Sequence, residues 1–122
     1  MGWYKKSDID PEKLDWAERH NVEISPDGKF VLYHGTTHGD KIRSSGFFNS
    51  GTLFAQDPRE AYNFALRSYH KQSGKGIEVL TVLVPPNLVA CGIWCQALRE
   101  IPLEIVKSQT YPISGDVGNE LV

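Results

Sequence analysis

The sequence has little of what defines several large classes of protein. Its 122 residues include only two cysteines, one methionine and four histidines, and its formal net charge at pH 7 is −2. That charge gives no global electrostatic attraction to nucleic acid, so a nucleic-acid partner would need a local basic patch. The scattered histidines and cysteines lack the spacing of a zinc site, and no serine occupies a Gly-x-Ser-x-Gly turn. We therefore expect neither a bound metal nor the mechanism of a serine hydrolase.

Long apolar segments are missing as well. No run approaches the roughly 20 apolar residues that span a bilayer, and residues 1–6 lack the apolar stretch of a secretion signal. If residues 91–95 are helical, Cys91 and Cys95 lie on one helix face, which is a poor geometry for a disulfide. We expect two buried, reduced thiols, no membrane contact and a cytoplasmic location, with delivery into another cell as an open alternative.

The chain does contain enough apolar material for one domain. With 40% hydrophobic, 11% aromatic and 23% charged residues, it is expected to fold around a single core. We expect a leader over 1–9, one domain over 10–113 and a frayed tail over 114–122.

Local patterns predict short helices and antiparallel strands, which together indicate an α+β fold. Asp10 followed by Pro11 is typical of a helix start, and Asp57-Pro58 opens an amphipathic helix that we expect to run through Tyr69. The nearly continuous apolar run over 77–84 predicts a central strand. Further strands are expected over 22–24, 29–33, 52–55 and 99–106, one or two helical turns over 40–46, and a helix around 94–98.

The most informative segment is residues 30–37, where a hydrophobic strand pattern ends in His34-Gly35-Thr36. Glycine has no Cβ, so a ligand can approach the backbone of Gly35 closely. His34 offers a ring donor and a ring acceptor, and Thr36 offers a hydroxyl. This combination suits a sugar or an amide better than a metal, although taken alone it is also typical of a strand end and a turn.

The order of several segments resembles that of the ADP-ribosyltransferase superfamily, in the branch shared by diphtheria toxin and the poly(ADP-ribose) polymerases. Those enzymes carry a His on one strand, a Tyr on a second and a Glu on a late strand. The resemblance covers residues 30–110, roughly, and implies a small ADP-ribosyltransferase-like fold. The matching segments are Tyr33-His34-Gly35-Thr36, Gly46-Phe47, Gly51-Thr52-Leu53-Phe54-Ala55, the helix through Ala61, and Arg99-Glu100-Ile101-Pro102-Leu103.

The resemblance implies NAD as the substrate, with no metal. His34 would bind the adenosine ribose, the backbone of Gly35 would hold the nicotinamide carboxamide, and Thr36 would support a ribose hydroxyl. Glu100 would take the catalytic place, with Glu104 on the same face of the predicted strand as its rival. A carboxylate beside the ribose 2′-OH stabilises the oxocarbenium-like transition state in which the bond to nicotinamide breaks.

The second-strand tyrosine of the family falls on Leu53. Leucine can cover a nicotinamide ring but cannot stack on it as an aromatic ring does. The resemblance therefore leaves the aromatic surface of an NAD site to Phe54, Tyr62 or Tyr69.

One cluster of basic residues lies at the end of the predicted helix that Asp57-Pro58 opens. Arg67 and Lys71, with His70 and Lys75 nearby, would contact the phosphates of NAD or of a nucleic-acid acceptor. The alternative is a solvated helix end, since cations there complement the helix dipole.

Together with the resemblance, these features predict a mono-ADP-ribosyltransferase, and four types stay open: toxin, effector, phage factor and housekeeping enzyme. It would cleave NAD at the nicotinamide–ribose bond and transfer ADP-ribose to a protein or nucleic-acid acceptor. Three alternatives stay open: a degenerate module that binds NAD or ADP-ribose without transfer, a relative of the RNA 2′-phosphotransferases, and a non-enzymatic domain that binds a partner.

Overall fold

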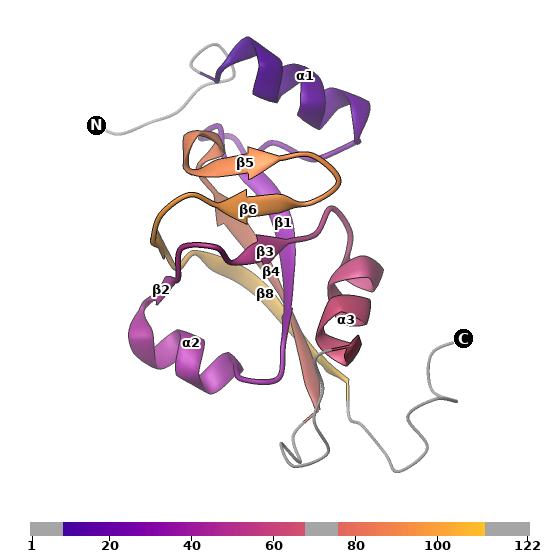
Figure 1. Cartoon of the computed structure of the whole chain (residues 1–122), viewed down its shortest axis with the longest axis vertical. Coiled ribbons are helices and arrows are strands. Elements are labelled where there is room, and N and C mark those ends of the chain that lie inside the picture. Colours follow the sequence, from indigo (N-terminus) through magenta and orange to yellow (C-terminus); the bar gives the residue numbers. More distant parts are fainter. Residues whose placement is uncertain (1–8, 68–75, 112–122) are drawn as a thin grey trace.

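A computed structural model describes residues 9–67 and 76–111 of the chain (Figure 1). The predicted tail over 114–122 lies outside these residues, as does the predicted leader apart from the buried Ile9. The elements follow in the order α1 (Pro11–Arg19), β1 (Phe30–Thr36), α2 (Gly39–Ser45), β2 (Phe47–Phe48), β3 (Leu53–Phe54), α3 (Pro58–Arg67), β4 (Ile77–Val84), the 3-10 turn η3 (Pro86–Leu88), β5 (Val89–Cys91), β6 (Cys95–Ala97), β7 (Ile101–Pro102) and β8 (Ile105–Tyr111).

The largest sheet has the strand order β1-β4-β8, and both pairs are antiparallel. β4 lies in the middle and buries side chains on both faces, since Val79 and Leu80 are neighbours in sequence and both are buried. A strand with two buried faces needs a continuous apolar run. The prediction of a central strand over 77–84 is therefore confirmed.

Two smaller antiparallel sheets lie across β1. One pairs β2 with β7, and the other has the order β3-β6-β5. A single bridge between Tyr33 and Ala55 joins β1 to the segment that follows β3. The predicted α+β class with mostly antiparallel strands and short flanking helices is confirmed at this level.

The core has two parts, one on each side of the large sheet. The larger part lies between this sheet, the two small sheets and α1, and its fully buried side chains include Phe30, Leu32, Phe54, Leu80, Val82, Val84, Val89, Cys95 and Ile101. The smaller part lies under α3 and is formed by Ala55, Ala61, Tyr62, Ala65, Ile77 and Val79. α3 thus covers the end of β1 at which His34-Gly35-Thr36 is found (Figure 1).

α1 begins as the sequence predicts. The Asp10 carboxylate accepts a hydrogen bond from the backbone N–H of Glu12 (2.8 Å), and Pro11 occupies the first turn. The helix packs on the β5–β6 hairpin, where Lys13 donates to the carbonyl oxygens of Pro86 (2.7 Å) and Val89 (3.0 Å).

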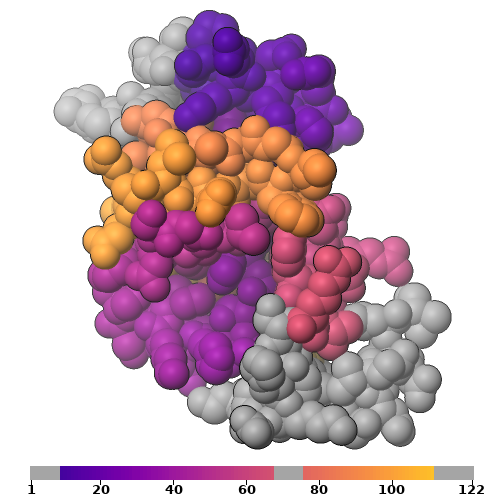
Figure 2. Space-filling model, viewed as in Figure 1, coloured from indigo at the N-terminus to yellow at the C-terminus, as the bar shows by residue number. Residues whose placement is uncertain are grey.

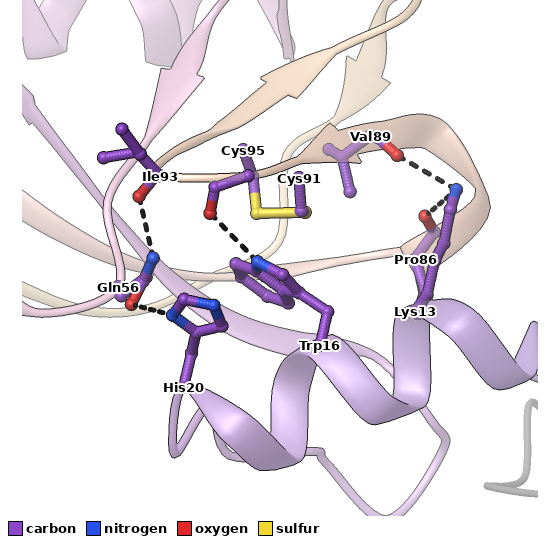
Figure 3. Close-up of a disulfide and its surroundings, with 10 residues drawn as sticks. Lys13, Trp16, His20, Gln56, Pro86, Val89, Cys91, Ile93 and Cys95 are labelled. Carbon is purple, nitrogen blue, oxygen red and sulfur yellow. Dashed lines mark hydrogen bonds between the residues drawn. A yellow bond between two sulfur atoms is a disulfide. The ribbon is translucent and has the colours of Figure 1, made fainter.

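The helix expected around 94–98 is wrong. Residues 89–97 form the β5–β6 hairpin instead, with a loop over 92–94, and Cys91 lies directly opposite Cys95. Positions four apart share a helix face, but they also face each other across a three-residue hairpin loop, and here they form a disulfide (Figure 3). The expectation of two reduced thiols is therefore wrong, and the cysteines give no support to a cytoplasmic location.

Two predicted strands are only partly formed. Over 22–24 the chain makes a single bridge, from Ile24 to Phe30, although the turn that follows is present with Gly28 at φ 84°. The strand expected over 99–106 is split into β7 and the start of β8, because residues 103 and 104 leave the ladder. Within the described residues, no helix is both long enough and apolar enough to cross a membrane.

Candidate functional site

The imidazole of His34 is fixed by the backbone of β3. Its Nδ1 lies 2.9 Å from the carbonyl oxygen of Leu53. A carbonyl only accepts, so Nδ1 carries the proton and donates, and Nε2 of the neutral ring is left as an acceptor. Burial lowers the pKa of His34 below its ordinary value, against the smaller opposing effect of this hydrogen bond. At neutral pH His34 therefore presents one acceptor nitrogen.

Gly35 is required by the packing of α3 on β1. A Cβ at this position would lie 2.0 Å from the carbonyl oxygen of Ala61 and 3.1 Å from the Cβ of Ala65. The first distance is far inside any contact that real atoms make, so a side chain here would push α3 away from the strand. The glycine thus lets helix and strand backbones meet beside His34.

The backbone of Gly35 also faces an open edge of β1. Along this edge the N–H of Val31 donates to Glu23 (2.9 Å), and Tyr33 exchanges both hydrogen bonds with Ala55 (3.0 and 2.7 Å). Alternate residues of a strand direct their N–H and C=O groups to the same edge. Gly35 comes next in this alternation, and within the described part of the chain no backbone partner meets its groups there.

Thr36 shapes the turn that leads into α2. Its side chain is buried, and its hydroxyl oxygen accepts the backbone N–H of His38 at 2.9 Å. The hydroxyl oxygen is therefore already engaged by the loop that it helps to form.

A cavity of about 480 Å³ opens at this end of β1, and we call it the main cavity because it contains His34-Gly35-Thr36; two cavities elsewhere on the surface are larger, at about 580 Å³ each. The volume of the main cavity is in the range of small-molecule sites. Its lining combines the end of β1, the segment around β3 and one face of α3, namely Tyr33, His34, Gly35, Thr36, Thr37, His38, Gly51, Leu53, Ala55, Ala61, Phe64 and Ala65. Figure 2 shows a hollow there, bordered by the magenta segment that contains β3 and the pink α3.

A side cavity of about 260 Å³ lies on the other side of His34. It shares His34 and His38 with the main cavity and continues along α2 and the loop before β3. Its further lining mixes one cation, three neutral polar groups and apolar side chains: Lys41, Ile42, Ser45, Phe47, Phe48, Asn49 and Thr52. His34 thus stands between two adjoining cavities.

The structure brings together four of the residues that the sequence singles out. His34, Gly35, Thr36 and Leu53 all line the main cavity, and Leu53 is partly exposed there. The others lie elsewhere: Phe54 is fully buried behind His34, Tyr62 packs against Tyr111 beside a different cavity, and Arg67 is exposed at the end of α3. Tyr69 and Lys71, with His70 and Lys75, lie outside the described residues.

The two candidate carboxylates do not join this group. Glu100 is exposed just before β7 and lines neither the main nor the side cavity. Glu104 forms an ion pair with Lys29 (Nζ–Oε1 2.5 Å), and this hydrogen bond raises the pKa of Lys29. In the described parts of the chain, no Asp or Glu lines the main cavity.

The predicted site residues do not include Phe64, which lines the main cavity, or Gln96, which lies next to two of its lining residues. Phe64 belongs to the predicted inner face of α3, but it lines the main cavity and is the aromatic wall that Leu53 does not provide. Gln96 pairs with Leu53 across β3 and β6, so both side chains project from the same face. The Gln96 amide nitrogen lies 3.9 Å from where a Cβ on Gly51 would be. The helical pattern of residues 58–67 already placed Phe64 on an inner face. Gln96 could not be recognised, because the sequence predicted a helix around 94–98 in place of the strand that pairs with Leu53.

An ion pair between Arg43 and Glu78 holds α2, which follows the loop after Thr36, against the large sheet. Arg43 of α2 donates two hydrogen bonds to the Glu78 carboxylate of β4, one of them at 3.0 Å, and the Ser108 hydroxyl donates to the same carboxylate. This pairing lowers the pKa of Glu78 and raises that of Arg43. A Cβ on Gly39 would lie 1.9 Å from Glu78 Oε1, so the start of α2 rests directly on the carboxylate.

Among the residues that the structure describes, no three His, Cys, Asp or Glu side chains are grouped closely enough to hold a metal ion. Comparisons of the chain with family models, with curated proteins and with solved structures give no match.

Proposed function

We propose that the main cavity binds the nicotinamide end of NAD and that the chain is a mono-ADP-ribosyltransferase with a small ADP-ribosyltransferase-like fold. The observation that carries the proposal is the open backbone edge at Gly35, inside a cavity that also holds His34 and Phe64. A primary carboxamide has one acceptor and two donors. The N–H and C=O of one residue on a free strand edge match that pattern.

The rest of the nucleotide would follow the cavities past His34. Its Nε2 would accept a hydrogen bond from a ribose hydroxyl, since Nδ1 is already used on Leu53. The adenosine half would lie in the side cavity, where Phe47 and Phe48 offer apolar surface and Lys41 offers a positive charge for a phosphate.

Transfer of ADP-ribose needs a carboxylate that acts as the positive charge on the ribose develops. We assign this role to Glu100, with Glu104 as the rival. Because Glu104 is paired with Lys29, its use would cost that ion pair. Glu100 forms no ion pair with any residue of the described ranges, but it must reach the ribose from outside the cavity lining.

A second candidate function is an NAD- or ADP-ribose-binding module without transfer. Two observations favour it: the described lining of the main cavity contains no acidic residue, and an amide, Gln96, lies opposite Leu53. A neutral amide binds a hydroxyl but stabilises a developing cation less than a carboxylate does. A cytoplasmic site of action remains part of the proposal, without support from the paired cysteines.

Calorimetric titration with NAD tests the common part of both candidates. Saturable binding with a thermal shift is expected, since ligand at 100 times its Kd adds about 2.7 kcal/mol of stability. Absence of binding would leave only the partner-binding and RNA 2′-phosphotransferase alternatives. Release of nicotinamide from NAD then separates the transferase from the module, and labelled NAD in a cell lysate identifies a protein or nucleic-acid acceptor.

A further inference from the structure

The loop of the β5–β6 hairpin is held by three different constraints. The Cys91–Cys95 disulfide closes it covalently. The indole N–H of Trp16 donates to the carbonyl oxygen of Gly92 (2.9 Å), and the amide of Gln56 donates to that of Ile93 (2.7 Å). Figure 3 shows the disulfide between these side chains and the loop. The disulfide is the only one of the three that a change of redox state removes.

This loop carries Trp94 to the wall of the main cavity. The Trp94 indole packs edge-on against the Phe64 ring, with centroids 4.6 Å apart and an interplanar angle of 68°. Phe64 lines the cavity, and Trp94 itself is 37% exposed, so the two rings form a step at its edge. Trp94 directly precedes Cys95, so the fixed sulfur restrains the backbone from which the indole projects.

We propose that Trp94, held by the Cys91–Cys95 disulfide, positions Phe64, and that the aromatic wall of the main cavity is complete only in the oxidised protein. This inference rests on the proposed binding of NAD. Phe64 contacts the nicotinamide ring in that arrangement, and Trp94 acts through Phe64 rather than on the ligand.

Reduction by a dithiol removes the constraint. One thiolate of the reductant attacks a cysteine sulfur and forms a mixed disulfide, and its second thiol displaces the remaining cysteine. The products are the thiols of Cys91 and Cys95 and the disulfide of the reductant, so atoms and electrons balance. The loop then keeps its hydrogen bonds to Trp16 and Gln56 and the backbone bond from Gly92 N–H to the Trp94 carbonyl oxygen (2.8 Å). It loses its covalent closure, so the Trp94 indole gains freedom and its edge contact with Phe64 weakens.

The test compares NAD with ADP-ribose, which lacks the nicotinamide ring. We expect dithiothreitol to weaken NAD binding about 2- to 10-fold, the effect of one aromatic contact. ADP-ribose affinity should stay within about twofold, because no ring rests on Phe64. A role limited to general stability would weaken both ligands equally, so the ratio of the two affinities is the diagnostic readout. Mass spectrometry verifies that the disulfide has been cleaved.

Variants separate the parts of the mechanism. The Cys91→Ser/Cys95→Ser protein should bind NAD and ADP-ribose with the affinities of the reduced wild type, and dithiothreitol should not change them. Trp94→Ala should lose NAD affinity to the same extent, and Trp94→Phe should restore most of it by keeping an aromatic edge. Ile93→Ala, in the same loop and 75% exposed, is the matched control and should change neither affinity.

Tryptophan fluorescence of the protein without ligand tests the same inference. Reduction should shift the tryptophan emission of the wild type, and this shift should be smaller in Trp94→Phe, which keeps the response of Trp16 beside the disulfide. Equal NAD affinity before and after verified reduction would overturn the inference and leave the proposed function intact. Failure of the oxidised wild type to bind either ligand would overturn the proposed function, and the inference with it.

Discussion

The floor and the rim of the main cavity are built by different kinds of interaction. The floor is the end of β1, from Tyr33 to Thr36, and α3 lies against it by direct contact of backbone at Gly35 and Ala61. The rim is the segment with Gly51 and Leu53, together with Phe64 and the β5–β6 hairpin behind it, and it is held by a disulfide and by side chains that bind carbonyl groups.

Because of this difference, the floor tolerates few substitutions, whereas the side chains of the rim can vary. A backbone contact leaves no room for a side chain, so the floor depends on residue size. At the rim, a change at Gln96 or Trp94 alters the surroundings of the lining residues Leu53 and Phe64 and leaves the main core in place, because both changed side chains are exposed or partly exposed. We therefore expect substitutions in the floor to act on stability first and those in the rim on ligand chemistry first.

The largest effect is expected from Gly35→Ala. A Cβ placed 2.0 Å from the Ala61 carbonyl oxygen must displace α3. We expect a loss of about 3 kcal/mol in the free energy of unfolding, the upper end for overpacking, and loss of NAD binding. Urea unfolding measures it. Gly92→Ala is the matched control in the hairpin, because a Cβ there has no atom of a described residue within 4 Å. Equal stability of the two variants would contradict the account of the floor.

The next effect concerns the carboxylate. If Glu100 stabilises the transition state, Glu100→Gln should slow nicotinamide release about 100-fold while NAD affinity stays unchanged. Gln96→Glu, which puts a carboxylate opposite Leu53, should raise the rate. Steady-state release of nicotinamide is the measurement, with the exposed Glu18→Gln on α1 as the control. Full activity of Glu100→Gln, with loss in Glu104→Gln, would transfer the role to Glu104.

A smaller effect is expected at His34. His34→Phe keeps a ring against Phe48 and Phe54 but removes the acceptor nitrogen, so NAD affinity should fall about 3- to 10-fold, the effect of one hydrogen bond. His20→Phe, which keeps a ring over Trp16 outside the cavity, is the control. Titration calorimetry measures both, and unchanged affinity of His34→Phe would rule out a hydrogen bond from the ligand to this ring.

The same side chain predicts a pH dependence. Only the neutral imidazole accepts at Nε2, and burial lowers the pKa of His34 in the folded protein. NAD affinity should therefore hold through the ordinary titration range of histidine and fall only at lower pH. The unfolded chain binds a proton at higher pH than the folded one, so stability also decreases as the pH falls below the ordinary value. In His34→Phe the fall in affinity should vanish, and the loss of stability in acid should be smaller by the contribution of His34.

The comparison of floor and rim also explains what the sequence predicted. The floor and the central strand follow from local patterns: the strand ending at His34-Gly35-Thr36 and the apolar run of β4 are each visible within one window. The helix that begins after Asp57 is present as far as it is described, over Pro58–Arg67. Its prediction needed only the Asp-Pro start signal and the helical spacing of its apolar residues.

The rim could not be predicted in the same way, because it depends on pairing between distant segments. Cys91 and Cys95 fit a helix face and a hairpin equally well by spacing, and the tertiary contacts with α1 favour the hairpin. A helix around 94–98 gives Gln96 no partner strand, so the sequence could not predict that Gln96 lies opposite Leu53. The prediction of Glu100 as the catalytic carboxylate rests on the neighbouring residues in sequence, and these carry no information on its distance from His34.

The smallest effect is expected at the clamp between α2 and the large sheet, which fixes the floor from the side away from the rim. Arg43→Ala should cost about 1 kcal/mol of unfolding free energy at pH 7, since the Arg43 side chain is 42% exposed and the Glu78 side chain only 16%. The pKa of Glu78 is lowered in the folded state by Arg43, so this contribution is present above the ordinary carboxyl range and is lost as the pH falls through the lowered value. Urea unfolding at pH 7 and at acid pH should therefore show a smaller gap between wild type and variant in acid. Arg19→Ala removes an exposed pair with Asp15 and should change stability by less than about 0.5 kcal/mol at either pH. A constant gap for Arg43→Ala would mean that its side chain acts by packing rather than by charge.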